Sequence, residues 1–120
     1  MSSNKKVVER YMASMSRMDR PAVLSCLTDD VEWSIVTAGE RMRGKEEFER
    51  NIGDPATMGD VRIEIARMTE ENEVVVAEGT VHVSPKQGDP ATYQFCDVFE
   101  LEGAKVKRLT TFTAQVKGPS

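Results

Sequence analysis

One acidic residue stands among aromatic and aliphatic neighbours, and its chemistry decides much of what the chain can do. By the two-residue period of a strand, Asp97 shares a face with Tyr93, Phe95, Phe99 and Leu101. A carboxyl group on such a face is costly unless it is paired or protonated. Asp97 is therefore a candidate proton donor or acid–base residue with a raised pKa in a pocket. The alternative is a face turned to solvent near a strand end, or a pairing with an arginine.

Three other titratable residues are candidates to work beside Asp97. Tyr11 lies on the apolar face of an expected helix, as a core tyrosine or as a hydrogen-bond donor. Glu78 and His82 share one face of an expected strand, and an imidazole titrates in the range that suits proton transfer. If that face points into a cavity, either residue can act as the base; otherwise it is solvated, and His82 is a surface or interface residue. The catalytic residues we expect are Asp97, Tyr11, His82 and Glu78.

A second group of residues is suited to the walls of a pocket. Trp33, the only tryptophan, is by default a core residue and alternatively a wall against a flat apolar ligand. Met15 belongs to a helical stripe with Met12 and Met18, which is a core stripe that also makes a flexible wall. Thr111 is a common strand former that also offers a hydroxyl group. The ligand-binding residues we expect are Trp33, Met15, Phe95, Phe99, Leu109 and Thr111.

The elements that position these residues begin with three helices and a strand. Apolar residues recur at helical spacing from Val8 to Met18, and a second helix starts near Asp19-Arg20-Pro21. Residues 31–36 form a short strand, residues 37–43 a loop, and residues 44–52 a third helix that Gly53-Asp54-Pro55 ends.

From Asp60 the apolar period changes to two, which predicts four long strands joined by hairpins. They start at residue 60 and run over about 73–83, 92–101 and 105–115. Long strands must twist, so we expect an α+β fold with three N-terminal helices packed on a curved, mainly antiparallel sheet around a pocket. We expect a single domain over residues 1–120, with flexible tails at about 1–4 and 116–120.

Composition argues against several classes of function. The chain has 120 residues and a net charge of −4, which disfavours binding to a nucleic-acid backbone. Cys26 and Cys96 lack metal-ligand spacing and no glycine-rich phosphate loop occurs, so we expect no metal and no cofactor. No apolar run reaches the ~18 residues of a membrane span, and no signal core follows the first residues. We therefore expect a cytoplasmic protein with no nucleic-acid or membrane partner.

The order of elements and three short motifs resemble a known superfamily. The motifs are Asp29-Asp30-Val31-Glu32-Trp33, Arg43-Gly44-Lys45-Glu46-Glu47-Phe48, and the last hairpin from Asp97-Val98-Phe99-Glu100-Leu101 to Val106. Together they resemble the nuclear-transport-factor-two-like superfamily, and within it the SnoaL-like and ketosteroid-isomerase-like groups. The resemblance covers nearly the whole chain. It implies a cone of sheet and helices, of the cystatin-like type, around one pocket.

The resemblance also implies roles for single residues. Ketosteroid isomerases use a tyrosine on the first helix and an acid on a late strand to bind a dienolate oxygen, and Tyr11 and Asp97 stand at those places. Trp33 occupies the place of the aspartate that moves the proton, so that proton shuttle is absent here. In limonene epoxide hydrolases, which are similar in fold, the late aspartate would fall near Thr111, so their catalytic set is incomplete.

Two functions and one assembly follow as hypotheses. The first is a SnoaL-like isomerase, cyclase or hydratase that does acid–base chemistry on an apolar, carbonyl-bearing small molecule. The second is a non-catalytic binding or regulatory module that holds an apolar ligand, which Trp33 motivates. The third is a structural or interaction protein, which acts as a homodimer through the outer face of the sheet, as the resemblance implies, and which can coexist with either of the others. On that face we expect the alternating residues Val75, Ala77, Val81, Cys96 and Val98.

Overall fold

A computed structural model describes residues 2–53 and 58–116 of the chain. Its helices are α1 (Ser3–Ser16), α2 (Arg20–Ser25) and α3 (Gly44–Arg50), with a short 3-10 helix, η1 (Val36–Ala38). Its strands are β1 (Leu27–Ile35), β2 (Glu40–Arg43), β3 (Asp60–Glu71), β4 (Val74–Ser84), β5 (Ala91–Glu102) and β6 (Lys105–Val116). They form one six-stranded sheet in the order β2-β1-β6-β5-β4-β3. β1 and β6 run parallel, and the other neighbouring pairs run antiparallel.

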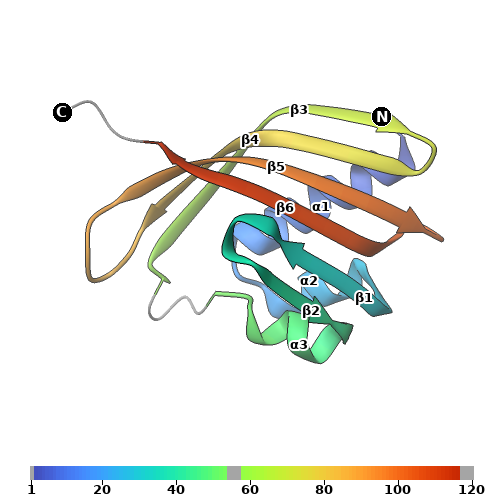
Figure 1. The fold of residues 1–120 in the computed structure, drawn as a ribbon, viewed down its shortest axis with the longest axis horizontal. Coiled ribbons are helices and arrows are strands. Elements are labelled where there is room, and N and C mark those ends of the chain that lie inside the picture. Colours follow the sequence, from blue (N-terminus) through green and yellow to red (C-terminus); the bar gives the residue numbers. More distant parts are fainter. Residues whose placement is uncertain (1, 54–57, 117–120) are drawn as a thin grey trace.

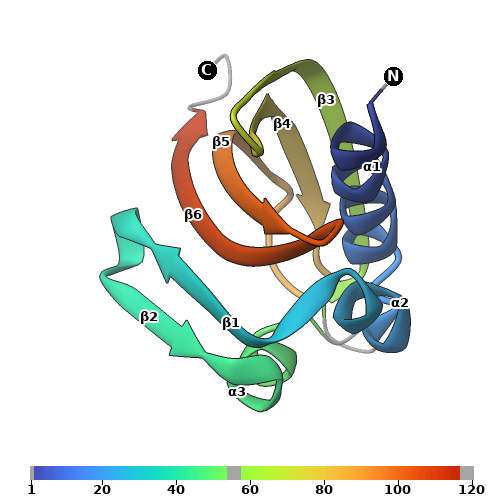
Figure 2. The same ribbon diagram turned by 90° about the vertical axis from the view of Figure 1, so that its right-hand side faces the viewer.

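The sheet curls, and the helices lie on its inner side (Figure 1). Figure 2 shows strands β3 to β6 bending over, with α1 along the β3 end and α3 beside β1 and β2. Such curling follows from the right-handed twist that accumulates along long strands. The expected α+β fold, with three N-terminal helices packed on a curved and mainly antiparallel sheet, is confirmed.

Local sequence explains how the first two helices start and which face they bury. The side chain of Ser2 caps α1 and that of Asp19 caps α2, each by accepting a backbone N–H hydrogen bond. Val8, Tyr11 and Met12 share the inner face of α1 and are buried. Burying this stripe stabilises α1, because an isolated helix of such length is marginal in water.

Alternation along β5 turns its apolar residues inward. Phe95, Asp97, Phe99 and Leu101 are all buried, as the two-residue period predicted. Ala77 of β4 lies directly opposite Asp97, so the two side chains share the inner face of the sheet. The most deeply buried large side chains are Phe48, Phe99, Leu27, Leu101 and Leu109.

Gly79 allows β3 and β4 to approach closely. The register of this strand pair shifts between Ile65 and Arg67, which is a β-bulge, and Gly79 pairs with Ile65. A Cβ atom on Gly79 would lie 2.0 Å from the backbone oxygen of Glu64 and 2.9 Å from Cε2 of Phe95. A bulge bends the strand and increases its twist, so this glycine helps to curve the sheet over the helices.

The second strand was not expected from the sequence. β2 occupies Glu40–Arg43, where we expected a loop, because this segment pairs antiparallel with β1. Met42 is the only buried residue of this strand, so the segment has no apolar alternation that would predict a strand. β1 is also longer than expected and begins at Leu27 rather than at residue 31.

The ends of the expected domain fall partly outside the described residues. Residue 1 and residues 117–120 of the expected tails lie outside them, as do residues 54 and 55 of the segment expected to end the third helix. Ser3 and Asn4 belong to α1, and Val116 is the last residue of β6. Among residues 2–53 and 58–116, no helix has the length and apolarity needed to cross a bilayer.

Candidate functional site

An apolar pocket lies between α1 and the inner face of the sheet, with a volume of about 200 Å³. Its walls are almost wholly apolar, and Asp97 brings the one carboxyl group among them. Side chains reach it from α1 and from β1, β3, β4, β5 and β6. The lining residues are Tyr11, Met12, Met15, Trp33, Met58, Val61, Ile63, Val81, Val83, Phe95, Asp97, Thr111 and Thr113.

Asp97 is the buried titratable group at the centre of this site. Its side chain is buried, and its Oδ1 atom has no hydrogen-bond partner within the described structure. Burial raises the pKa of Asp97 from 3.8 to about 7, although the neighbouring Thr111 hydroxyl lowers it in part. Near neutral pH the carboxyl group therefore populates both its charged and its neutral form.

Trp33 and Thr111 form a buried polar contact next to Asp97. The indole Nε1 of Trp33 donates a hydrogen bond of 2.9 Å to Oγ1 of Thr111. The indole ring also stacks on Phe48, with ring centres 4.5 Å apart and an interplanar angle of 25°. Trp33 is thus a core residue that also forms part of the pocket wall.

Tyr11 is held rigidly at the same pocket. Its ring makes edge contacts with Phe48 and Phe99, at centroid distances of 6.3 and 5.3 Å. Burial raises the pKa of Tyr11 well above its ordinary value, and the nearby Asp97 and Cys26 raise it further. Its phenol group therefore stays protonated and remains a potential donor. The structure brings Tyr11 and Asp97 to one pocket without a direct hydrogen bond to Asp97 Oδ1.

Glu78 and His82 do not join this pocket. In β4 they alternate with Ala77, which lies on the inner face opposite Asp97, so both residues point to the outer face. The expectation that they could face the cavity and supply the base is therefore wrong. Arg67 binds the Glu78 carboxylate through two hydrogen bonds of 2.7 and 3.0 Å, which lower the pKa of Glu78.

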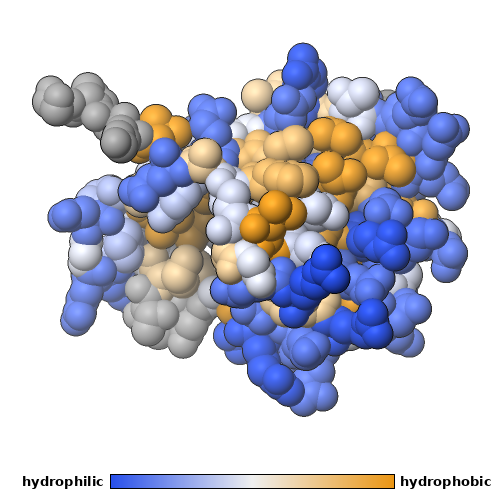
Figure 3. All heavy atoms as spheres, in the orientation of Figure 1, coloured by the Kyte–Doolittle hydropathy of each residue, from blue (hydrophilic) through white to orange (hydrophobic). Residues whose placement is uncertain are grey.

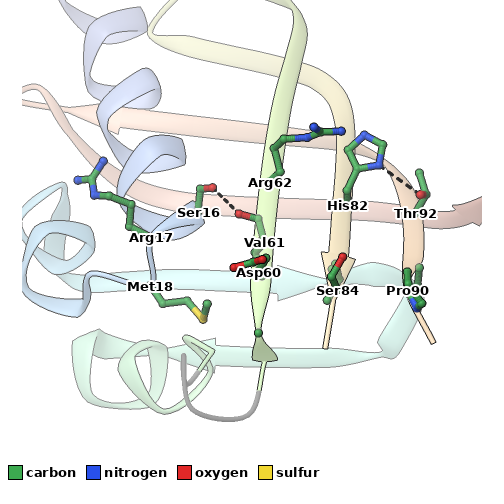
Figure 4. A pocket seen from close by; sticks show the side chains of 13 residues that line it. Ser16, Arg17, Met18, Asp60, Val61, Arg62, His82, Ser84, Pro90 and Thr92 are labelled. Carbon is green, nitrogen blue, oxygen red and sulfur yellow. Dashed lines mark hydrogen bonds between the residues drawn. The ribbon is translucent and has the colours of Figure 1, made fainter. Parts of the chain in front are cut away.

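His82 instead borders a second, more polar hollow at one end of the sheet (Figure 4). There its Nδ1 atom lies 3.3 Å from the hydroxyl of Thr92, and its Nε2 atom lies 3.6 Å from Glu64. Ser16 at the end of α1 donates a hydrogen bond of 2.8 Å to the backbone oxygen of Val61, which ties the helix to β3 beside this hollow. The hollow has a volume of about 810 Å³ and shares Val61 and Val83 with the apolar pocket.

The expected wall residues divide into two groups. Met15, Phe95, Trp33 and Thr111 line the pocket. Phe99 and Leu109 are fully buried and are not among its lining residues, because they pack deeper between the sheet and the helices. Both were expected to contact a ligand, and in the structure they are core residues.

Sequence reasoning missed several wall residues. Val61, Ile63, Val81 and Val83 line the pocket from β3 and β4. Their two-residue alternation was visible in the sequence, but alternation alone does not tell which face is the inner one. For the same reason Val75, Ala77 and Val81 were wrongly placed on the outer face; Val75 and Ala77 are completely buried on the inner one.

The described residues contain no group of three or more His, Cys, Asp and Glu side chains arranged to hold a metal ion. Four lining residues offer polar side-chain atoms to a ligand, as hydroxyl groups and one carboxyl group. They are Tyr11, Asp97, Thr111 and Thr113. Such a set can hydrogen-bond to a ligand and exchange one proton with it.

Comparison with known proteins adds a family and a set of related folds. The family model described as SnoaL-like domain matches residues 8–109. Among solved structures, an NTF2-like protein of unknown function from Burkholderia pseudomallei is 27% identical, with a TM-score of 0.78; the match covers 92% of this chain and 90% of that one. No curated protein matches the sequence.

Two further solved structures share the fold at lower identity. TerC, co-crystallised with polyporic acid, is 23% identical with a TM-score of 0.80, and the match covers 92% of this chain and 90% of that one. An LEH-like epoxide hydrolase from M. tuberculosis is 18% identical with a TM-score of 0.82, covering 93% of this chain and 83% of that one. At these identities the likeness concerns the fold, because one fold carries many chemistries.

Proposed function

This chain belongs to the SnoaL-like domain family, and on that premise we propose that its apolar pocket binds a small, carbonyl-bearing molecule on which Asp97 does acid–base chemistry. The reaction would be an isomerisation, cyclisation or hydration. Asp97 exchanges the proton, Tyr11 donates a hydrogen bond to the substrate oxygen, and Trp33 packs on the substrate.

One observation carries this proposal: the carboxyl group of Asp97 belongs to the lining of an apolar pocket, and its Oδ1 atom has no hydrogen-bond partner within the described residues. A buried polar atom without a partner costs roughly 1–3 kcal/mol, which a ligand group at hydrogen-bond distance would offset. A carboxyl group with a pKa of about 7 is also suited to both giving and taking a proton at physiological pH. An aspartate with a purely structural role would need neither the unpaired oxygen nor the raised pKa.

The chemistry fits a single acid–base group. The Asp97 carboxylate takes a proton from the carbon next to the carbonyl, and the released electron pair moves onto the carbonyl oxygen. The protonated Tyr11 hydroxyl donates to that oxygen as its charge develops. The Asp97 carboxylic acid then returns the proton to a carbon or oxygen of the product. Trp33 has no basic site, and Glu78 and His82 lie on the other face, so Asp97 performs both transfers.

The first test is a titration with ketones and phenols of one to four rings, followed by the fluorescence of the only tryptophan, Trp33. We expect saturable binding of the one- and two-ring compounds, and at least a tenfold loss of affinity in Asp97→Ala. Hydrogen–deuterium exchange next to the ketone carbonyl, followed by NMR, reports proton transfer directly. Glu78→Gln is the matched control, because it removes an acid from the outer face, and it should bind and exchange as the parent does. Equal binding and exchange in Asp97→Ala would refute the role of Asp97.

The second candidate function is a protein that holds a ligand without catalysis. It is favoured because Trp33 occupies the place where ketosteroid isomerases have the aspartate that moves the proton. In that case the ketones would bind with the same dependence on Asp97 but would exchange no hydrogen. The exchange experiment therefore separates the two functions, because binding alone supports both.

We also propose that two copies of the chain pair through the outer face of the sheet. Phe112 and Val116 of β6 are 42% and 40% exposed there, although both are large and apolar. Cys96 lies opposite Phe112, and Val76 lies opposite Val98, so the apolar side chains adjoin one another across three strands. Figure 3 shows apolar atoms gathered over these strands. An apolar patch of this kind on a sheet typically marks an interface.

Phe112→Glu is expected to convert a dimer into a monomer, because a charge would then be buried in the proposed interface. Light scattering at micromolar protein would show the mass fall to 13.4 kDa. Ala13→Glu places the same charge on the exposed side of α1 and should leave the dimer intact. A parent protein that is already monomeric at this concentration would contradict the proposal.

A further inference from the structure

The polar hollow at the end of the sheet adjoins a set of side chains that the apolar pocket does not use. His82 on β4 lies directly opposite Thr92 on β5, and its Nδ1 atom is 3.3 Å from the threonine Oγ1 (Figure 4). On the other side of the ring, Nε2 lies 3.6 Å from Oε1 of Glu64 on β3. Carboxylate, imidazole and hydroxyl in this order activate a hydroxyl nucleophile in many enzymes. We refer to Glu64, His82 and Thr92 as the outer triad.

The Glu64 carboxylate decides which nitrogen of His82 carries the proton. A carboxylate only accepts hydrogen bonds, so it favours the tautomer of the neutral ring with the proton on Nε2. Nδ1 then keeps its lone pair, and this nitrogen is the one that faces the Thr92 hydroxyl. The imidazole is therefore placed to take the hydroxyl proton when the threonine oxygen attacks a substrate.

Strands, and not a loop, hold these groups in place. Arg62, His82 and Thr92 lie opposite one another across β3, β4 and β5. Opposite residues of antiparallel strands have Cβ atoms about 5 Å apart, which brings their side chains into contact. The His82 side chain is 33% exposed, so the ring is partly enclosed and a substrate can still reach it. A site built on strands keeps its geometry better than one built on loops.

Arg62 adds a cation to the same hollow. Its Nε atom lies 3.1 Å from Oε1 of Glu64, the oxygen that also faces His82, so Glu64 orients both side chains. Figure 4 shows the Arg62 guanidinium beside the His82 ring. The hollow measures about 810 Å³, and Arg62, His82 and Thr92 all line it. It therefore has room for a small substrate in contact with all three groups.

We propose that this hollow hydrolyses small carboxylic esters, with Thr92 as the nucleophile, His82 as the general base and Arg62 as the donor to the oxyanion. Glu64 is a positioning residue, because it acts through His82 and Arg62 and touches no reacting atom. None of these four residues lines the apolar pocket, so the inference goes beyond the proposed function and does not depend on it. The hollow lies at the rim of the patch proposed for pairing, since Thr92 lies opposite Val116.

The reaction has two steps. Thr92 Oγ1 attacks the carbonyl carbon of the ester while its proton passes to His82 Nδ1, and the Arg62 guanidinium stabilises the negative charge that develops on the carbonyl oxygen. When this intermediate collapses, the alcohol leaves with the proton from His82, and the acyl group stays on Thr92. Water then attacks the acyl group and gives a proton to His82. The carboxylic acid leaves, and the proton returns from His82 to the threonine oxygen.

The test follows the release of p-nitrophenol from p-nitrophenyl acetate and, by mass spectrometry, the acetyl group left on the protein. We expect saturable turnover above the buffer rate, with the acetyl group on Thr92. Thr92→Val, which keeps the shape of the side chain, and His82→Gln should each lower kcat/KM about a hundredfold. Thr92→Ser should keep the turnover, because it keeps a hydroxyl group. Glu64→Ala should lower kcat at unchanged KM, and nitrogen NMR should show the His82 proton shared between Nε2 and Nδ1.

Glu78→Gln serves as the control, because it removes an acid from the outer face of the same strand as His82, outside the outer triad, and it should hydrolyse the ester as the parent does. If Thr92→Val keeps the parent rate while His82→Gln loses it, the imidazole attacks the ester by itself and the proposal is overturned. It is overturned equally if the parent shows only the buffer rate, or if acetyl groups appear on lysines alone. If Thr92→Val does not fold, the site of acetylation in the parent and in Thr92→Ser still decides.

Discussion

The Asp97→Asn variant is expected to be more stable than the parent protein at pH 8 and to have lost proton transfer. In the folded protein the pKa of Asp97 is raised from 3.8 to about 7, so the folded state holds a proton that the unfolded chain has already released. The free energy of unfolding therefore falls as the pH rises from about 4 to about 7, by roughly 4 kcal/mol over the whole window. An uncharged amide escapes this cost, because it has no charge to bury.

Urea unfolding between pH 4 and pH 8 measures this effect. The two proteins should differ least near pH 4, where the folded acid is neutral and the unfolded one is about half ionised, and should diverge as the pH rises. Glu78→Gln is the control. Arg67 lowers the pKa of Glu78, so removing the Glu78 carboxylate should not stabilise the protein at pH 8. If the free energies of unfolding of the parent and Asp97→Asn changed in parallel with pH, folding would not raise the pKa of Asp97. A stability gain paired with lost activity is a common signature of a functional residue.

The Gly79→Ala variant should lose much of its stability, by about 3 kcal/mol or more. The added Cβ atom would lie 2.0 Å from the backbone oxygen of Glu64, which no side-chain rotation can relieve. β3 would have to shift away from β4 at the bulge, and the ring of Phe95, 2.9 Å from the same Cβ position, would move into the pocket wall. Thermal and urea unfolding measure the loss of stability, and ligand titration shows whether the displaced Phe95 ring changes binding in the pocket.

Gly103→Ala is a matched control for that change. Gly103 adopts a φ of +57°, which disfavours alanine, yet nothing lies within 4 Å of its Cβ position. Its substitution should cost only the backbone strain, about 1 kcal/mol. If Gly79→Ala were no more harmful than Gly103→Ala, the close approach of β3 and β4 would not be a constraint on the fold.

Much of the fold could be predicted because its signals are local. The three- and four-residue spacing of Val8, Tyr11 and Met12 predicts α1, and the two-residue spacing around Asp97 predicts β5. β2 escaped prediction because a short edge strand with one buried residue, Met42, has no periodic signature. It exists because β1 offers it a partner, which is a tertiary effect.

The site was predicted in part for a related reason. Asp97, Tyr11, Trp33 and Thr111 do meet at one pocket, and apolar context or resemblance pointed to each of them. Glu78 and His82 were misplaced because a strand pattern defines two faces and leaves open which one is inner. The pairing of Ala77 with Asp97 decides that question, and register between strands is set by contacts that a single sequence does not display.

The parallel pairing of β1 with β6 has a consequence for how the protein is made. Trp33 and Thr111 are 78 positions apart, so the site is assembled across most of the chain. While the ribosome is still synthesising the chain, β1 has no neighbour on that side until β6 has emerged. The nascent protein must close a very long loop before the indole reaches its threonine, and closure of this kind slows folding. The contact between Trp33 and Thr111 can therefore form only after all six strands of the described sheet have been made.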